Sequence, residues 1–289
     1  MSQKKIAILI HENDKSFYIY PPFITLLIRE WERYGFIVEV IRGIERFINA
    51  DVIIPHIDLT VIPDKYLSFL NNYPVVVNRH VVNISKSKFS SSIIGPNDSY
   101  RGPVIIKTDR NYGGLPERRL LSKPKNRYLM LAKVYADYLY LKLFACKGAS
   151  YLDPTRYPVY ESLKEVPPKI FKNKNFIVEK FLTERDGEYY CLRRWIFLGD
   201  RSVNVFSRSK DRIVKPSNTI SIEHIPVPEE LYSIRQYLKF DYGKFDYVLQ
   251  DGKVVLFDVN RTMAYNRHAK TAFAQETAQF LAEGIRSFL

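Results

Sequence analysis

Two kinds of segment alternate over the first eighty residues of the chain. The segment 22–34 repeats its apolar residues at helical spacing, begins with a proline and is followed by Gly35, which are start and stop signals of an α-helix. Short apolar runs that fit β-strands stand at 5–10, 36–41, 51–55 and 75–78. Strands that alternate with helices predict a parallel sheet covered by helices. No glycine triplet follows the first strand, so the pattern does not favour a dinucleotide-binding domain.

From residue 176 onward the pattern predicts mainly strands. They are expected at 176–181, 188–197 and 203–208. A hairpin follows, in which the runs 247–250 and 254–259 flank Asp251 and Gly252. Asp-Gly accepts the positive φ that a two-residue turn requires, so this is a strong hairpin signal. Helices are predicted at 128–142 and 270–289.

The hairpin carries candidate metal ligands. Asp246 opens it, and Asp258 and Asn260 close it. Residues two apart on a strand share a face, so Asp258 and Asn260 should meet Asp246 across the ladder. Two carboxylates and an amide oxygen form an all-oxygen cluster that suits Mg²⁺ beside nucleotide phosphates. An ordinary exposed hairpin is the alternative interpretation of this segment taken alone.

Two upstream motifs strengthen the metal interpretation. The first is an apolar strand that runs from Gly102 to Lys107, followed by a polar loop with the paired glycines Gly113 and Gly114. A lysine supplies a point charge to phosphate, and glycines let backbone N–H groups approach it. The second is the strand 176–182, which ends in Glu179-Lys180-Phe181-Leu182 and is followed by Glu184 and Glu188.

In this order the motifs resemble the ATP-grasp superfamily, and within it the carboxylate–amine ligases. The resemblance covers residues 86–262 and depends on the order and spacing of the motifs. It implies an α/β chain with an ATP-grasp fold, in which two α+β subdomains grip ATP, preceded by a Rossmann-like parallel-sheet domain. The expected domains are residues 1–85 for the Rossmann-like pre-ATP-grasp domain, 86–178 for the small subdomain and 179–289 for the large subdomain with the metal site.

The resemblance also implies a set of ATP-binding residues. Lys107 would contact the phosphates, and a loop through Gly113 and Gly114 would close over them. The hinge strand would offer its backbone to the adenine edge through Glu179, Lys180, Phe181 and Leu182. Glu188 would hold the ribose, with Glu184 as a second candidate. An earlier phosphate-binding lysine would be Lys86 or Lys88, and the short segment 89–103 leaves that choice open.

The metal and catalytic residues follow in the same way. The resemblance implies that Asp246, Asp258 and Asn260 bind Mg²⁺, with Mn²⁺ as an alternative, although the family usually has glutamate at the Asp258 position. Lys244 stands where some amide-forming members keep an arginine that steadies the reacting acyl phosphate. Further catalytic candidates are Arg193 and Arg208. Arg193 and Arg194 point to opposite faces of one strand, so one of them faces the nucleotide.

The front domain is expected to bind the acceptor. Ligands collect at the carboxyl ends of parallel strands, and those ends are polar here. Arg79 is favoured for a substrate carboxylate, because its planar fork pairs with two oxygens. The full set of expected substrate contacts is His56, Asp58, Asn78, Arg79 and Arg261. Taken singly, these residues could instead make turns and caps in loops.

The expected activity is therefore an ATP-dependent carboxylate–amine, or carboxylate–thiol, ligase that acts through an acyl phosphate and releases ADP and phosphate. Its partners would be ATP, a small-molecule or peptide carboxylate and an amine nucleophile. One alternative is an ATP-grasp kinase that phosphorylates a hydroxyl. The other is a non-catalytic basic protein that binds nucleic acid, which the ATP-grasp motifs disfavour.

Composition changes this picture little. The 289 residues have 46% hydrophobic content, typical of a folded globular protein. The formal charge of +13 attracts any polyanion, but its lysines and arginines are spread out. The apolar run 6–10 is too short for a signal peptide or a membrane span, so we expect no membrane insertion and a cytoplasmic location. Cys146 and Cys191 fit no zinc spacing and are expected to be plain thiols.

Overall fold

The computed structural model describes residues 3–121, 151–154, 157–264 and 272–289. These residues form two compact units, one made of residues 1–83 with 183–289 and the other of residues 84–182. The boundaries predicted at 85 and 178 lie close to the ends of the second unit. The sequence predicts domains at 1–85, 86–178 and 179–289, whereas residues 1–83 and 183–289 form one compact unit here. The predicted helix at 128–142 lies outside the described residues.

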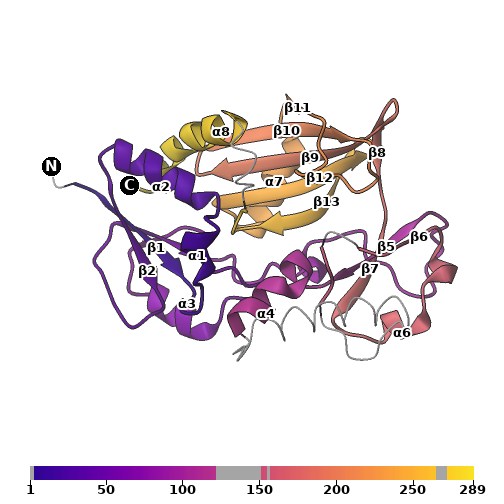
Figure 1. The fold of residues 1–289 in the computed structure, drawn as a ribbon, viewed down its shortest axis with the longest axis horizontal. Helices are drawn as coiled ribbons and strands as arrows, with labels where there is room; N and C mark the ends of the chain where they lie inside the picture. The colour runs from indigo at the N-terminus through magenta and orange to yellow at the C-terminus, as the bar shows by residue number, and fades with distance from the viewer. Residues whose placement is uncertain (1–2, 122–150, 155–156, 265–271) are drawn as a thin grey trace. The chain divides into compact units, whose positions relative to one another are not determined.

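The first unit begins with a four-stranded parallel sheet in the order β2-β1-β3-β4, here called the front sheet (Figure 1). Its strands are β1 (Lys5–Ile10), β2 (Ile37–Arg42), β3 (Val52–His56) and β4 (Val75–Val76). The helices among them are α1 (Ser16–Ile19), α2 (Ile24–Arg33) and α3 (Asp64–Leu70). The predicted strands and helix are confirmed, and the apolar run of β1 is buried from Ile6 to Ile10.

The second part of this unit is an antiparallel sheet in the order β11-β10-β9-β12-β13, with β8 paired to β9. The strands are β8 (Glu184–Asp186), β9 (Tyr189–Leu198), β10 (Arg201–Ser209), β11 (Ser221–His224), β12 (Tyr242–Gln250) and β13 (Lys253–Asn260). Helix α7 (Glu229–Leu238) precedes β12. Helix α8 (Ala272–Ala282) and a 3₁₀ turn (Glu283–Phe288) end the chain.

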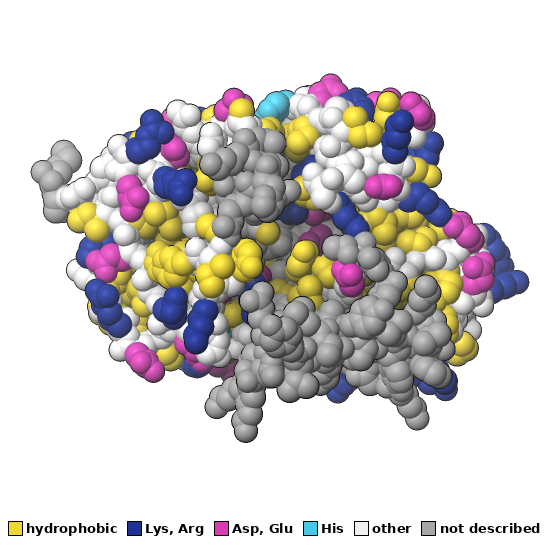
Figure 2. Space-filling model, in the orientation of Figure 1, with side chains coloured by type: hydrophobic (Ala, Val, Ile, Leu, Met, Phe, Trp, Pro, Cys, Tyr) yellow, Lys and Arg dark blue, Asp and Glu magenta, His cyan; other side chains and the backbone are white. Residues whose placement is uncertain are grey.

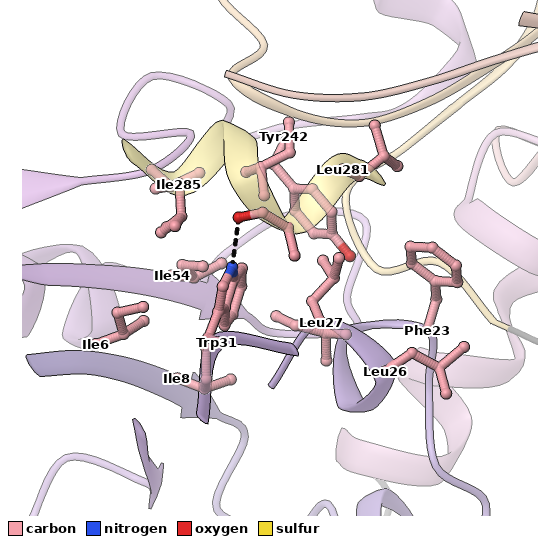
Figure 3. Packing of buried hydrophobic residues seen from close by; sticks show 14 of the residues in the cluster. Ile6, Ile8, Phe23, Leu26, Leu27, Trp31, Ile54, Tyr242, Leu281 and Ile285 are labelled. Atoms are coloured by element: carbon pink, nitrogen blue, oxygen red, sulfur yellow. Dashed lines mark hydrogen bonds between the residues drawn. The ribbon is translucent and has the colours of Figure 1, made fainter. Parts of the chain in front are cut away.

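One hydrophobic core joins the two sheets of the first unit. It combines Ile6, Ile8 and Ile54 of the front sheet with Leu281 and Ile285 near the carboxyl end of the chain. At its centre the fully buried Trp31 donates a hydrogen bond from Nε1 to the carbonyl oxygen of Ala282, at 2.9 Å (Figure 3). The first and last segments of the chain therefore stabilise each other.

The second unit is smaller and has its own core. Its three-stranded antiparallel sheet has the order β6-β5-β7, with β5 (Val104–Thr108) between β6 (Val159–Tyr160) and β7 (Phe176–Lys180). Val104, Ile106 and Val178 pack into an apolar cluster beneath it. The remaining elements are α4 (Leu115–Leu121), α6 (Pro168–Phe171) and the 3₁₀ turns Lys86–Lys88, Asn111–Gly114 and Leu163–Glu165. Of the helices in the described ranges, none is long and apolar enough to span a membrane.

Candidate functional site

The two faces of the antiparallel sheet differ in chemistry. Phe245 of β12 packs with Trp195 and Phe197 of β9, at ring distances of 5.9 and 5.0 Å. Its neighbours Lys244 and Asp246 point to the opposite face because side chains alternate along a strand. We call this opposite face the acid face, and define it by Lys244, Asp246, Asp258, Asn260 and Arg194. The register places these residues across β9, β12 and β13, where Asp246 pairs with Asp258 and with Arg194.

A β-bulge brings the second acid onto this face. The turn residues Asp251 and Gly252 have φ of 51° and 76°, as predicted for a two-residue hairpin. A regular ladder from that turn would pair Asp246 with Phe257. Instead, the register shifts so that Tyr247 pairs with Leu256 and Asp246 with Asp258. Phe257 is therefore the extra residue, and the predicted meeting of Asp246 and Asp258 is confirmed.

Close polar contacts link the residues of the acid face. The Lys244 ammonium lies 2.6 Å from Oδ2 of Asp246, and both side chains are mostly buried. Asn260 pairs with Lys244 across the ladder. Its Oδ1 accepts a hydrogen bond from the backbone N–H of Thr262 at 2.7 Å. The Thr262 hydroxyl donates to Oδ1 of Asp58 at 2.8 Å, so a predicted substrate residue lies beside a predicted metal ligand.

Arg194, not Arg193, lies on the acid face. Its Nη2 donates to the Ser207 hydroxyl at 2.5 Å, and its backbone pairs with that of Asp246. Burial lowers the pKa of the Arg194 guanidinium, and the charge of Asp246 acts in the opposite direction. A positive group that is poorly solvated and close to a carboxylate is suited to bind an anion that enters the site.

Arg193 and Arg208, the predicted catalytic arginines, lie on the other face of the sheet. Arg193 makes a bidentate ion pair with Glu184, at 2.6 and 2.9 Å, and this hydrogen bonding raises the pKa of its guanidinium. Arg208 contacts Asp186 at 2.6 Å and Glu223 at 2.9 Å. Both guanidinium groups lie 4.8 Å from the ring of Phe206. The structure therefore does not bring these two residues together with the acids.

The acid face supplies some of the ligands that a hard divalent cation needs, but not all of them. No group of three His, Cys, Asp or Glu side chains in the described ranges is arranged to hold a metal ion. Asp246 and Asp258 supply two carboxylates, and Oδ1 of Asp246 is buried and accepts no hydrogen bond from the described residues. Such an oxygen is costly to bury without a partner. The donor set suits Mg²⁺ that keeps further ligands from water or phosphate.

Asn78, a predicted substrate residue, instead forms a joint between the two sheets of the first unit. It is buried at the end of the front sheet and has a left-handed φ of 59°. Its Oδ1 accepts from the backbone N–H groups of Asp241 and Tyr242, at 2.7 and 3.0 Å. Its Nδ2 donates to the carbonyl of Tyr242, and its own N–H donates to Asp241, each at 2.6 Å. These bonds leave it little capacity for a substrate.

Arg261 has a similar structural position. It follows β13, is 1% exposed, and donates to the carbonyl oxygens of Val81, at 3.0 Å, and Leu59. His56 is also buried, with its ring edge-on to Phe17 at 5.9 Å. Arg79 is half-buried and donates to the carbonyl of Tyr73 at 2.9 Å. Of the predicted substrate residues, Asp58 is the one linked through Thr262 to the acid face.

In the second unit, Lys107 forms a buried ion pair with Glu179. The Lys107 ammonium lies 2.6 Å from Oε2 of Glu179, and the two side chains are 11% and 1% exposed. The register pairs Ile105 with Glu179 and Lys107 with Ile177, so the two charges meet diagonally across β5 and β7. The buried carboxylate therefore fixes the position of the Lys107 ammonium near the end of β5.

The glycine-rich loop has a constrained backbone. Tyr112, Gly113 and Gly114 have φ of 44°, 68° and 79°. A Cβ at Gly113 would lie 2.0 Å from the carbonyl oxygen of Leu152, so only glycine fits there. The N–H of Leu152 also donates to the carbonyl of Gly113 at 3.0 Å. Left-handed backbone of this kind exposes N–H groups that can bind an anion.

The backbone of the hinge strand is partly occupied. The N–H of Lys180 donates to the carbonyl of Ser92 at 2.9 Å, and the N–H of Phe181 to that of Pro103 at 2.8 Å. The Lys180 ammonium lies over the Tyr100 ring at 5.3 Å. The next residue, Leu182, ends the second unit and is half-buried.

The remaining predicted ATP contacts have mixed positions. Lys86 is buried and donates from Nζ to the carbonyl of Arg110 at 3.0 Å, whereas Lys88 is exposed. Glu188 is exposed in the turn between β8 and β9, beside Gly187 with φ of 58°. Glu184, the second ribose candidate, is held by Arg193.

Sequence reasoning left out two residues of this site. Arg194 was not among the candidates, although strand alternation offered it as the alternative to Arg193, and the register with Asp246 decides between them. Thr262 was also missed. It contacts the nearby Asn260, but it also contacts Asp58, which lies 204 positions earlier in the chain, and no local pattern predicts that contact. Figure 2 shows Lys and Arg side chains scattered among acidic and apolar ones over the coloured part of the face in view, without a continuous basic patch there.

Compared by sequence with protein-family models and with curated proteins, the chain has no match in either set. Solved structures are similar along nearly the whole chain. A RimK domain ATP-grasp protein from Sphaerobacter thermophilus has a TM-score of 0.52 at 10% identity, covering 98% of this chain and 99% of its own. A D-alanine–D-alanine ligase from Bacillus anthracis has 0.50 at 11% identity, covering 99% of both chains. The VanG D-Ala:D-Ser ligase from Enterococcus faecalis has 0.52 at 11% identity, covering 100% of both.

These likenesses show that the chain has the ATP-grasp fold, with parallel and antiparallel sheets as the sequence predicted.

Proposed function

We propose that this ATP-grasp chain is an ATP-dependent ligase that joins a carboxylic acid to an amine through an acyl phosphate. The observation that carries the proposal is the acid face, where Asp246 pairs with Asp258 and the cationic groups of Lys244 and Arg194 lie beside them. Carboxylates suit the metal ion of a nucleotide complex, and the cations suit a phosphoryl group in transfer. One sheet face thus carries both kinds of group.

Asp246, Asp258 and the amide oxygen of Asn260 would hold the metal, which would neutralise phosphate charge. The residues of the chain would do the rest by charge and alignment. Lys244 would turn from Asp246 to the transferring phosphoryl group, and Arg194 would stabilise the negative charge that develops on it. The substrate carboxylate would attack the γ-phosphorus, ADP would leave, and the amine would then displace phosphate from the acyl carbon.

The second unit is assigned the nucleotide itself. Lys107, positioned by Glu179, would contact the phosphates, and the glycine loop would cover them with its N–H groups. The N–H groups of Lys180 and Phe181 already have partners, so we assign the adenine hydrogen bond to the N–H of Leu182.

The test is ADP formation in the presence of candidate acids and amines, with mass spectrometry of the product. Release of ADP that requires both an acid and an amine supports the ligase. A thiol in place of the amine gives the carboxylate–thiol variant of the same proposal. Release that requires an alcohol supports the kinase, and the absence of release with every acceptor overturns the proposal.

Variants of the acid face sharpen this test. Asp258→Ala should lower turnover at least a hundredfold, because it removes one of two carboxylates without removing a core contact. Asp200→Ala is the matched control, since that aspartate is exposed in the turn between β9 and β10. Full activity of the Asp258→Ala variant at ordinary Mg²⁺ would exclude the assigned metal role.

A further inference from the structure

Lys244 occupies one oxygen of a carboxylate, Asp246, that the proposed function gives to a metal ion. Lys244 and Asp246 are two apart on β12, and the ammonium lies 2.6 Å from Oδ2 of Asp246. The two side chains are 24% and 15% exposed. A lysine could extend into water from such a position, so its return to the neighbouring carboxylate is a specific interaction.

The two carboxylates of the acid face have positive side chains beside them without a metal. Asp246 and Asp258 are paired across the ladder, and Lys244 and Arg194 lie beside Asp246. Within the acid face, these two positive side chains offset the two carboxylates and so weaken their attraction for a divalent ion. A cation that enters this face would also be repelled by both positive groups until one of them moves. Arg194 is held by Ser207, whereas Lys244 has a flexible stem.

We propose that Lys244 is a built-in substitute for the metal ion, which keeps free divalent cations off the acid face until a nucleotide arrives. Resting on the proposed function, the inference adds an order of binding: metal and nucleotide enter together. The phosphates then supply the anionic partner to which the Lys244 ammonium transfers, and this movement frees Oδ2 of Asp246 for the metal.

The experiment measures Mn²⁺ binding to the nucleotide-free full chain. The electron paramagnetic resonance signal of free Mn²⁺ reports how much of the ion stays unbound. Lys244→Gln should bind Mn²⁺ at least tenfold more tightly than the unaltered protein. Lys253→Gln is the matched control, because Lys253 lies on the same hairpin but is exposed beside the turn; it should bind as the unaltered protein does. Lys244→Arg, which keeps the charge, should restore weak binding.

A second substitution shows which carboxylate is responsible for the higher Mn²⁺ affinity. Asp246→Asn combined with Lys244→Gln should abolish the added affinity, since the freed oxygen is then no longer a carboxylate. The inference is overturned if Lys244→Gln binds Mn²⁺ no more tightly than the unaltered protein, or if the unaltered protein binds it tightly without nucleotide. Misfolding would break the pairing of Asp246 with Asp258, so a tenfold gain that disappears in the double variant reports the folded site.

The result separates this inference from the proposed function. ADP release with an acid and an amine, but no change in Mn²⁺ affinity, overturns the role of Lys244 alone. A tenfold gain of Mn²⁺ affinity without ADP release from any acceptor supports the substitute cation and overturns the ligase.

Discussion

Arg193 and Arg194 are neighbours on β9 and have different partners. Arg193 is held by Glu184 on one face of the sheet, and Arg194 contacts Ser207 beside Asp246 on the other. Neighbouring residues of a strand point to opposite faces. An arginine therefore forms a structural ion pair at position 193 and is a candidate phosphate contact at position 194.

This difference predicts opposite effects of the same substitution. Arg194→Ala should lower kcat for ADP formation by about 10²–10³, as expected for loss of a preorganised charge. Arg193→Ala should leave kcat within roughly threefold and lower the free energy of unfolding by about 1.5–3 kcal/mol, since it removes a charged hydrogen-bonded pair. Steady-state kinetics and urea unfolding of both variants test this. If Arg193→Ala had the larger effect on kcat, the faces would be wrongly assigned.

Asn78 provides a second prediction for a single residue. Asn78→Gly should lower the free energy of unfolding by about 2–4 kcal/mol, because three buried hydrogen bonds of its side chain are lost while glycine still accepts the left-handed φ. The control is Asn72→Gly, at an exposed position where the side chain makes one hydrogen bond to Phe69. Equal stability of the two variants in chemical denaturation would contradict the joint between the sheets.

Among the elements, strands with a clear apolar pattern could be predicted from the sequence and others could not. The bounds of β1 are those expected, because five consecutive apolar residues are buried there. Strand β12 begins at Tyr242, before the predicted start, since Gly243 and Lys244 interrupt the pattern. Strand β8 has only three residues, none of them apolar, and was missed. The bulge at Phe257 follows from pairing with β12 and leaves no local signal.

The hairpin β12–β13 allows a test of its turn. Gly252→Ala should destabilise the protein by about 1 kcal/mol, because its φ of 76° is unfavourable for a residue with a Cβ. The control is Gly95→Ala, where an added Cβ meets no atom within 4 Å and φ is not left-handed. That variant should be neutral or slightly stabilising. Thermal unfolding of both proteins would show whether the left-handed turn is needed.

At the scale of the whole molecule, the chain consists of two compact units with separate cores. Leu281 belongs to the core of the first unit and Ile106 to that of the second. The sequence predicts a small subdomain at 86–178, and residues 84–182 form the second unit. It did not predict that residues 1–83 and 183–289 share a core, because no local pattern records contacts across so long a separation.

Separate cores predict separate unfolding transitions. Leu281→Ala should lower the transition temperature of the first unit, and Ile106→Ala should lower that of the second. Each substitution should reduce the free energy of unfolding of its own unit by about 2–5 kcal/mol, as expected for a buried aliphatic side chain. Each variant is the control for the other. A common shift of both transitions in either variant would show that the units unfold as one.

The hydrogen bond from Trp31 to Ala282 sets a condition on the synthesis of the chain. Its partners are 251 positions apart, so a ribosome adding about 5–20 residues per second needs on the order of ten to fifty seconds between them. During that interval the nascent front sheet lacks the apolar cover that Leu281 and Ile285 provide. The second unit, encoded wholly within that interval, can complete its core first. The apolar surface around Trp31 stays exposed during that time, so a chaperone that holds nascent chains would bind there. Premature release of the chain would lead to aggregation through the same surface.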